Sequence, residues 1–342
     1  MSSSPSNSNS EKTFTIDPSD SLKYLTTYKI RVTTGVKDSA GNNLGSQYET
    51  SNGFKTLGVF VAVGNSGSIV RSTDNGSSFD STTSGTTNHF YGITYDNGTF
   101  TAVGASGMIL SSSDGITWTT RTSGIYQYFQ GTSSLYAVTV GDNGTLMAVG
   151  AGGYTLASTD GITWYGSLPY GSDIRGVCYG NNTFVAVTVA SSGRIYTSSN
   201  GISVIARDSG ISTQLNRVTF GNDTFVAVAH SGKIIRSTDN GSSWDNATSP
   251  TGNNLSGIAF GNDTFVAVGD SGNILRSTDN GSSFDNVTSP TANHLYAVGF
   301  GNNIFIAGGA SGNILRSTDN GLSWDNATSP TTIHLADIIF SE

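Results

Sequence analysis

The feature that most constrains this chain is a short unit that occurs seven times along its length. Its best-preserved copy reads Ser-Thr-Asp-Asn-Gly-Ser-Ser-Trp at 237–244. The other copies, intact or eroded, lie at 72–79, 112–118, 158–164, 198–204, 277–284 and 317–324. A carboxylate that accepts backbone N–H groups, a glycine with positive φ and an aromatic anchor together favour a tight hairpin. We therefore expect each copy to be a structural turn between two strands.

The Asp and the aromatic residue of each unit receive structural roles in this interpretation. The acidic members are Asp74, Asp114, Asp160, Asp239, Asp279 and Asp319. The aromatic members are Phe79, Trp118, Trp164, Trp244, Phe284 and Trp324. The most eroded copy has Asn200 and Val204 in these places. Because the bidentate Glu that ends a calcium loop is absent from every copy, we predict no metal site and no cofactor.

The spacing of the units predicts the architecture. The aligned Asp or Asn residues stand at 74, 114, 160, 200, 239, 279 and 319, so that all intervals but one are 39 or 40 residues. A period of about 40–45 residues is typical of one four-stranded propeller blade. In the last repeat, strands are expected at 295–300, 304–308, 313–317 and 322–327. The sequence thus predicts an all-β, seven-bladed β-propeller of four-stranded blades over residues 57–342.

The two ends of the propeller region predict how the ring closes. Residues 334–340 match only the first strand of a blade, as found at 294–300. Residues 59–63 instead begin directly with the second strand. We therefore expect the C-terminal strand at 335–340 to complete the N-terminal blade, which leaves no free sheet edge.

The pattern S-x-D-x-G-x-x-[WF] resembles the Asp-box, or BNR, repeat of β-propellers, with sialidase-like and photosystem II assembly factor-like repeats among its relatives. The sialidase resemblance implies glycoside hydrolysis as one class of function. Such enzymes use paired carboxylates at a fixed separation, or an arginine cluster with a Glu-activated Tyr. The glutamates are Glu11, Glu49 and Glu342, all outside the repeats, and no Arg-Ile-Pro signature occurs. We predict no catalytic residues, with a pair drawn from Asp173, Asp270 and Asp337 as the alternative.

The residues before the propeller lack the repeated unit and have a different composition. Residues 1–12 are a Ser-rich stretch that we expect to be a flexible leader. Residues 13–56 resemble the second half of a bacterial Ig-like domain, through Leu22, the loop Asp38-x-x-Gly41-Asn42 and the closing Phe54-Lys55-Thr56. The few strands of a partial Ig-like segment leave apolar positions uncovered. We expect the propeller or another chain to cover them, so self-association through this segment is one predicted partnership.

Composition excludes several classes of partner. The chain has 342 residues, 35% hydrophobic and 12% charged, with a net charge of −8. Nucleic acid is not expected, because its binding needs clustered Lys and Arg. No apolar run reaches the length of a membrane span, and the lone Cys178, expected to pack as a small hydrophobe, excludes an internal disulfide. The polar, low-lysine composition favours a secreted or bacterial cell-surface protein, although the first ten residues carry no export signal.

Positions at which the repeats disagree are candidates for recognition. One row, at the start of each inner strand, reads His89, Ser134, Asp173, Gln214, Asn254, His294 and His334. A second row, two residues later, reads Tyr91, Tyr136, Arg175, Asn216, Ser256, Tyr296 and Ala336. Strand alternation places both rows on one face, toward one mouth of the channel. The alternative is that this rim is polar only because it is solvated.

Two further elements join this rim. Loops between second and third strands bring His230 and Asp270, and the insertion at 124–130 brings Tyr126 and Tyr128. The aromatic residues of the insertion either pack on the neighbouring blade or form a stacking platform for a sugar or a peptide. The binding residues that we predict are therefore His89, Tyr91, Tyr126, Tyr128, Tyr136, Asp173, Arg175, His230, Asp270, His294, Tyr296 and His334. The sequence indicates a noncatalytic recognition module for a glycan or a protein. A glycoside hydrolase and a structural, assembly-forming surface protein are the alternatives.

Overall fold

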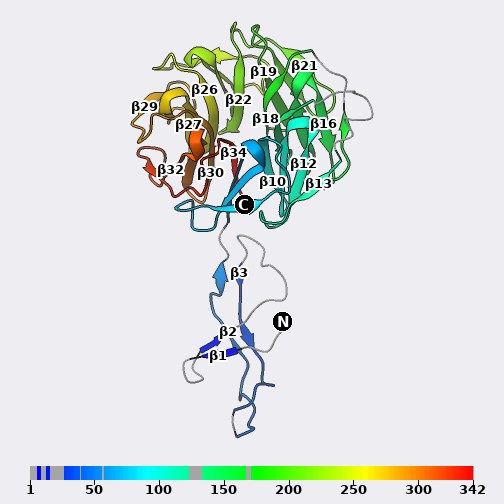
Figure 1. The fold of residues 1–342 in the computed structure, drawn as a ribbon, viewed down its shortest axis with the longest axis vertical. Coiled ribbons are helices and arrows are strands. Elements are labelled where there is room, and N and C mark those ends of the chain that lie inside the picture. The colour runs from blue at the N-terminus through cyan, green and yellow to red at the C-terminus, as the bar shows by residue number, and fades with distance from the viewer. Residues whose placement is uncertain are drawn as a thin grey trace. The chain divides into compact units, whose positions relative to one another are not determined.

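A computed structural model describes residues 6–8, 13–15, 27–38, 40–55, 58–122, 133–166 and 171–341. The chain separates into two compact units, Met1–Gly58 and Val59–Glu342. The second unit is an all-β propeller whose seven four-stranded blades form a ring around a channel (Figure 1). The predicted fold class is confirmed.

Each blade is an antiparallel meander from an inner to an outer strand. Blade 2 contains β10 (Phe90–Asp96), β11 (Thr99–Gly104), β12 (Ile109–Ser112) and β13 (Thr119–Arg121). Blade 3 contains β14 (Leu135–Val140), β15 (Leu146–Gly150), β16 (Thr155–Ser158) and β17 (Tyr165–Gly166). Blade 4 contains β18 (Ile174–Gly180), β19 (Thr183–Thr188), β20 (Ile195–Ser198) and β21 (Ile205–Arg207). Blade 5 contains β22 (Leu215–Gly221), β23 (Thr224–Ala229), β24 (Ile234–Ser237) and β25 (Asp245–Asn246).

The last two continuous blades follow the same plan. Blade 6 contains β26 (Leu255–Gly261), β27 (Thr264–Gly269), β28 (Ile274–Ser277) and β29 (Asp285–Val287). Blade 7 contains β30 (Leu295–Gly301), β31 (Ile304–Gly309), β32 (Ile314–Ser317) and β33 (Asp325–Asn326). The outer strand β33 is shorter than the predicted 322–327. Its first residues stay in the turn, where the N–H of Ser323 donates to Asp319 Oδ1 at 2.9 Å.

Short 3-10 turns join second and third strands in most blades. They are η1 (Asn65–Gly67), η2 (Ala105–Gly107), η4 (Ala151–Gly153), η5 (His230–Gly232), η6 (Asp270–Gly272) and η7 (Ala310–Gly312). Their middle residue has a left-handed backbone, as at Ser66 with φ 53°. The turns stand at the end of the channel where the inner strands begin, because Asn65 N–H donates to His334 O at 3.0 Å.

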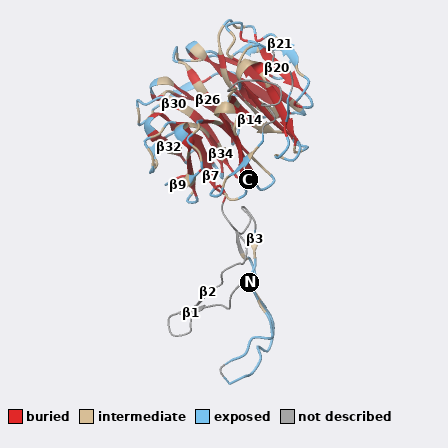
Figure 2. Ribbon diagram, turned by 45° about the vertical axis from the view of Figure 1, so that its right-hand side comes forward, coloured by how far each residue is buried: buried red, intermediate tan, exposed pale blue. Residues whose placement is uncertain are grey.

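Blade 1 joins the two ends of the propeller. β34 (Leu335–Phe340) pairs with β7 (Phe60–Gly64), which is followed by β8 (Ser68–Ser72) and β9 (Asp80–Thr83). The register places Phe340 opposite Phe60, with ring centroids 4.7 Å apart. Figure 2 labels β34 and β7 side by side. The predicted closure by the C-terminal strand is confirmed, and β34 pairs the edge of β7 that faces away from β8.

The hydrophobic core lies between the sheets of neighbouring blades (Figure 2). One cluster joins Val268 and Ile274 of blade 6 to Leu295, Phe305 and Trp324 of blade 7. The second strands are buried on both faces because each lies between two other blades, as the fully buried β27 illustrates. Such strands read as continuous apolar runs rather than alternating ones.

The repeated unit closes its own turn. At 237–244, Asp239 Oδ1 accepts the N–H of Ser243 at 2.9 Å and the hydroxyl of Ser237 at 2.8 Å. Ser237 Oγ accepts the N–H of Gly241, whose φ of 76° favours glycine. Desolvation would raise the pKa of Asp239, but these hydrogen bonds outweigh it and hold the pKa below its usual value. The carboxylate is therefore engaged within its own hairpin.

The aromatic member of the unit is buried to different extents. Phe79, Trp164, Phe284 and Trp324 keep 3–5% of their surface exposed. Trp118 and Trp244 are only half-buried. The arginine before the unit connects blades, since Arg276 Nε donates to Asn320 O of the next blade at 2.8 Å. The outer edge of the ring is thus held by the same hairpins that define the repeat.

The N-terminal unit consists of short paired strands. β1 (Ser6–Ser8) pairs with β2 (Thr13–Thr15), β3 (Thr27–Tyr28) with β6 (Phe54–Lys55), and β4 (Arg31–Val32) with β5 (Tyr48–Glu49). The Asp38 carboxylate accepts the N–H groups of Ala40 and Asn42 at 2.9 and 2.8 Å, which closes the predicted loop. Val36 and Tyr48 are 52% and 59% exposed. The described residues include no helix that is long and apolar enough to span a membrane.

Candidate binding site at the channel mouth

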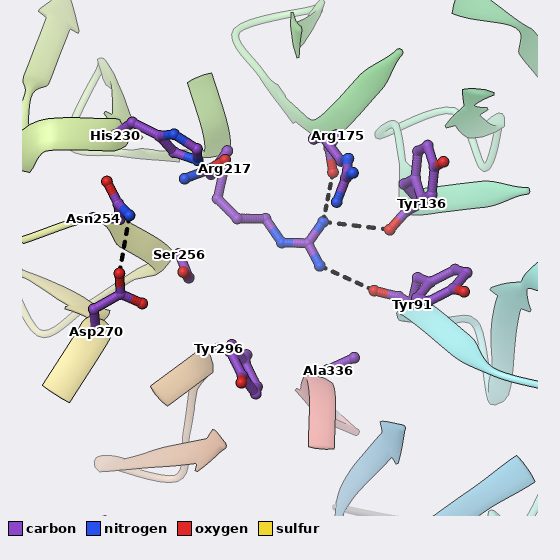
Figure 3. Close-up of a pocket in the computed structure, with 11 residues that line it drawn as sticks. Tyr91, Tyr136, Arg175, Arg217, His230, Asn254, Ser256, Asp270, Tyr296 and Ala336 are labelled. Atoms are coloured by element: carbon purple, nitrogen blue, oxygen red, sulfur yellow. Dashed lines mark hydrogen bonds between the residues drawn. The ribbon is translucent and has the colours of Figure 1, made fainter. Parts of the chain in front are cut away.

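Every inner strand of the propeller has a β-bulge one residue after its start. A bulge leaves its extra residue unpaired and redirects the side chain. The bulge residues are Tyr91, Tyr136, Arg175, Asn216, Ser256, Tyr296 and Ala336. All seven line one hollow of about 330 Å³, which we call the channel-mouth pocket (Figure 3).

Blades 2, 3 and 4 give the pocket an aromatic and cationic side. The rings of Tyr91 and Tyr136 lie 5.6 Å apart and are inclined by 56°. The guanidinium carbon of Arg175 lies 4.5 Å from the centroid of the Tyr136 ring, which is a cation–π contact. Desolvation and then the negative charge of Asp173 raise the pKa of Tyr136. Its hydroxyl therefore keeps its proton at neutral pH and can donate a hydrogen bond.

Blade 7 adds a further tyrosine, Tyr296, which is separated from Tyr91 by blade 1. The ring of Tyr296 stacks on His294, with centroids 6.4 Å apart and an inclination of 8°. Its other neighbour is His334, whose ring lies 5.9 Å away at 64°. Figure 3 shows Ala336 of blade 1 between Tyr296 and Tyr91. Because Ala336 contributes only a methyl group, a slot remains between the two tyrosines.

Blades 5 and 6 give the pocket a polar side. Asn254 Nδ2 donates to Asp270 Oδ2 at 2.9 Å, and Asp270 Oδ1 lies 2.9 Å from His294 Nδ1. His230 and Ser256 line the same side (Figure 3). Amide, hydroxyl, imidazole and carboxylate groups offer both donors and acceptors to a bound molecule. An aromatic wall therefore faces a hydrogen-bonding wall across the pocket.

Three residues of the first row have a structural bond that the sequence did not indicate. Each accepts the N–H of the middle turn residue in the preceding blade, at 2.8–3.2 Å. The pairs are His89 with Ser66, Asp173 with Gly152, and Asn254 with Ser231. The left-handed turn directs its N–H away from its own ladder, so a neighbouring acceptor satisfies it. These side chains connect blades as well as bordering the pocket.

Arg217 forms the floor of the pocket. Its side chain extends from blade 5 across the channel (Figure 3). Nη1 donates to Arg175 O at 2.7 Å and to Tyr136 O at 3.4 Å, and Nη2 donates to Tyr91 O at 3.0 Å. Below it lies a second cavity of about 170 Å³ lined by Thr94, Val138, Arg217 and other inner-strand residues. The guanidinium thus separates the pocket from the rest of the channel.

Asp337 of blade 1 is the anionic partner of this floor. Its Oδ2 lies 3.9 Å from Arg217 Nη2 and accepts the N–H of Ile93 at 3.0 Å. Desolvation raises the pKa of Asp337 although the Arg217 charge acts in the opposite direction. About a fifth of its side chain faces the channel, with 22% exposed. Water in so narrow a channel solvates a carboxylate less well than bulk water does.

The structure brings most of the predicted site residues together. Tyr91, Tyr136, Arg175, His230, Asp270 and Tyr296 line the channel-mouth pocket. His89, Asp173, His294 and His334 contact these lining residues or the turns beside them. Tyr126 and Tyr128 fall outside the described residues. Within the described part of the chain, no group of three or more His, Cys, Asp or Glu side chains is placed to hold a metal ion.

Comparison with known proteins agrees with the two-part organisation. Residues 1–56 match the family model of the bacterial Ig-like domain. No curated protein matches the chain in sequence. The structure "YCF48 bound to D1 peptide" has a TM-score of 0.60 and 18% identity, covering 79% of this chain and 88% of that chain. YCF48 from Cyanidioschyzon merolae has a TM-score of 0.55 and 19% identity, covering 71% and 86%.

The WD40 repeats of RRP9 are also similar in fold, with a TM-score of 0.59, 10% identity, and coverage of 82% of this chain and 89% of that chain. At such identities the similarity concerns the fold alone, and this fold is consistent with a binding module. The chain is therefore a seven-bladed β-propeller whose N-terminal residues are similar to the bacterial Ig-like domain.

Proposed function

We propose that this protein is a noncatalytic recognition module that binds a glycan in the channel-mouth pocket. The observation that carries the proposal is the opposition of two walls. Tyr91, Tyr136 and Tyr296 offer ring faces on one side, and Asn254 and Asp270 offer hydrogen-bonding groups on the other. A sugar ring has an apolar C–H face and a rim of hydroxyls, so it suits both walls at once. A hollow of about 330 Å³ has room for a small saccharide.

A peptide is the second candidate ligand. It is favoured by the similarity in fold to the structure "YCF48 bound to D1 peptide". The cation of Arg175 over Tyr136 suits a carboxylate or an aromatic side chain of a peptide. Peptides are therefore the second class of ligand for this site.

Hydrolysis is less well supported than binding. Asp173 is held by Gly152 N–H and the Tyr136 hydroxyl, and Asp270 by Asn254 and His294. Asp337 lies at the floor beside Arg217. Each carboxylate already has a local hydrogen-bonding role, whereas glycosidases expose an acid and a second carboxylate across the scissile bond. The repeated units themselves serve their hairpins.

A secreted or bacterial cell-surface setting is the third part of the proposal. It is supported by the Ig-like match at residues 1–56 and by the polar composition. The exposed Val36 and Tyr48 of the N-terminal unit suit association with a second copy of the chain. Analytical ultracentrifugation of the full chain and of residues 59–342 would give the mass of each in solution. A monomer in both cases would contradict self-association.

The ligand test uses the full chain on a glycan array and a peptide array, beside a panel of chromogenic glycosides. We expect array signals without turnover. The variants Tyr91→Ala and Tyr136→Ala should lose those signals, while Leu322→Ser, on the outer perimeter, should keep them. Turnover of any glycoside would contradict the noncatalytic proposal. Signals that survive both tyrosine substitutions would place binding elsewhere on the protein.

A further inference from the structure

The residue that follows the bulge is small in five of the seven inner strands. These residues are Gly92, Ala137, Gly176, Gly257 and Ala297. The inner strands approach one another closely here, since a Cβ added at Gly176 would lie 2.9 Å from the Cα of Arg217. The two exceptions are Arg217 and Asp337, which are opposite in charge and meet in the channel. The close approach of the strands at this level does not explain two charged residues here.

The contacts of Arg217 are confined to one side of the pocket. Its guanidinium donates to the carbonyl oxygens of Tyr91, Tyr136 and Arg175. These are the bulge residues of blades 2, 3 and 4, and their side chains form the aromatic and cationic wall. Tyr296 occupies the same bulge position in blade 7, and no described hydrogen bond joins its carbonyl to Arg217. All three carbonyl groups that accept hydrogen bonds from Arg217 therefore belong to residues of the aromatic and cationic wall.

Fixing those carbonyls also fixes the side chains. A bulge residue lacks ladder partners, so its peptide groups can rotate more freely than those of a paired residue. The carbonyl carbon and Cβ are both bonded to Cα, so a carbonyl that is held by a hydrogen bond restricts how far Cα can turn and where its side chain points. The planar guanidinium presents several donors in a rigid arrangement, which suits three converging acceptors better than an ammonium group does.

Asp337 completes the floor. Its carboxylate is bonded to the N–H groups of Ile93 and Ile338, and it faces Arg217 across 3.9 Å. A lone cation at the base of the pocket would attract any anion that entered. When Asp337 is ionised it balances the charge of Arg217, so that Arg217 can orient the wall while the floor stays close to neutral.

We propose that Arg217 is the positioning residue of the channel-mouth pocket, holding the bulge carbonyls of Tyr91, Tyr136 and Arg175 so that their side chains form one wall. The importance of this wall for binding rests on the proposed function. Its organisation by Arg217 can be tested without any ligand.

The test is fluorine NMR of the full chain labelled with 3-fluorotyrosine, with signals assigned through Tyr91→Phe, Tyr136→Phe and Tyr296→Phe. In Arg217→Met we expect the signals of Tyr91 and Tyr136 to shift and broaden, because their bulges lose a donor. The signal of Tyr296 serves as an internal reference and should stay in place. Arg217→Lys keeps the charge but reaches fewer carbonyls, so an intermediate change is expected.

A matched control separates positioning from general stability. Arg276→Met also removes an arginine that donates to a carbonyl of a neighbouring blade, but at the outer edge of the ring. It should leave all three tyrosine signals unchanged. The inference is overturned if the fluorine signals of Tyr91 and Tyr136 have the same positions and widths in Arg217→Met as in the wild-type chain. If Arg217→Met does not fold, the same comparison is made with Arg217→Lys. The inference is equally overturned if Arg276→Met shifts the same signals.

Binding provides a second readout. For a sugar or peptide selected on the arrays, the affinity of Arg217→Met should fall about tenfold, while that of Arg276→Met should not change. If the wild-type chain binds nothing on either array, the proposed function fails, and the fluorine spectra still decide whether Arg217 organises the wall. Unchanged affinity together with shifted tyrosine signals would show that this wall does not carry the binding.

Discussion

Arg175 and Tyr136, bulge residues of neighbouring blades, are in contact through a cation–π interaction with 4.5 Å between the guanidinium carbon and the ring centroid. Tyr136 also touches Tyr91 of the preceding blade. Three consecutive blades thus present their most variable position as one continuous surface. The repeated inner strand places these residues side by side because the same bulge recurs in every blade.

This contact predicts a coupled effect on ligand binding. Arg175→Gln and Tyr136→Leu should each weaken binding of an array-selected ligand by about 1 kcal/mol or more, and the double variant should lose less than the sum. Isothermal titration of the four proteins measures the coupling. Melting temperatures should change little, because Arg175 is exposed and Tyr136 is only partly buried. Additive losses would indicate that the two side chains act on the ligand separately.

The aromatic members of the repeated unit predict unequal losses of stability. Trp324 is 5% exposed and packs in the core between blades 6 and 7, so Trp324→Ala should cost about 3–5 kcal/mol. Trp244 is half-buried, and Trp244→Ala should cost less. Denaturant unfolding of both variants gives the comparison. Equal losses would mean that burial does not set the contribution of these anchors.

The carboxylates of the repeated unit predict acid lability. Hydrogen bonds from the N–H groups of Thr163 and Ile162 lower the pKa of Asp160 from 3.8 to about 2. A depressed pKa contributes stability that is present above pH 4 and is lost as pH falls toward about 2. Stability should therefore decline over this range when followed by circular dichroism during denaturant titration.

Asp160→Asn is the matched variant for this pH dependence. The natural Asn200 makes the same turn, accepting the N–H groups of Ile202 and Ser203 at 3.0 and 2.9 Å. The variant should fold and should lose less stability between pH 4 and 2 than the wild-type chain does, because an amide does not titrate there. An unchanged pH profile would show that Asp160 does not contribute to it.

Ring closure predicts the effect of a C-terminal truncation. Removing residues 335–342 takes β34 from β7, leaves one edge of β7 unpaired and uncovers Phe60. The truncated chain should aggregate or melt at a lower temperature, because a long apolar strand edge is exposed. Light scattering and thermal unfolding measure both effects, and a synthetic peptide of residues 335–342 should partly restore the monomer. A monomer of unchanged stability would contradict closure of the ring by this strand.

Much of the fold could be predicted because each blade carries the same local signal. The Ser, Asp and Gly of a unit such as 237–244 interact within one turn, so their chemistry is readable from the sequence alone. The blade period then follows from the spacing of these turns. The variable row from Tyr91 to Ala336 could also be found in the sequence, because the repeats are nearly identical on either side of it.

The rest of the site depends on contacts between residues far apart in the chain. Arg217 donates to Tyr91 O, 126 residues away, and no local pattern encodes that bond. The sequence did not indicate the bulges either. Strict strand alternation without a bulge already directs these side chains toward the channel mouth. The structural bonds of His89 and Asn254 to turns of the preceding blade depend on blade packing. The one local signal for Arg217 is a charged residue where most repeats have Gly or Ala.

Recognition through the pocket can be tested by filling it. Ala336 lies between Tyr296 and Tyr91, and a Trp at this position would occupy the slot between them (Figure 3). The affinity of Ala336→Trp for an array-selected ligand should be compared with that of Leu322→Trp, whose side chain lies on the outer perimeter and is 62% exposed in the wild type. We expect Ala336→Trp to abolish binding with the propeller still folded and Leu322→Trp to bind normally. Undiminished affinity of a folded Ala336→Trp protein would contradict binding at the channel mouth.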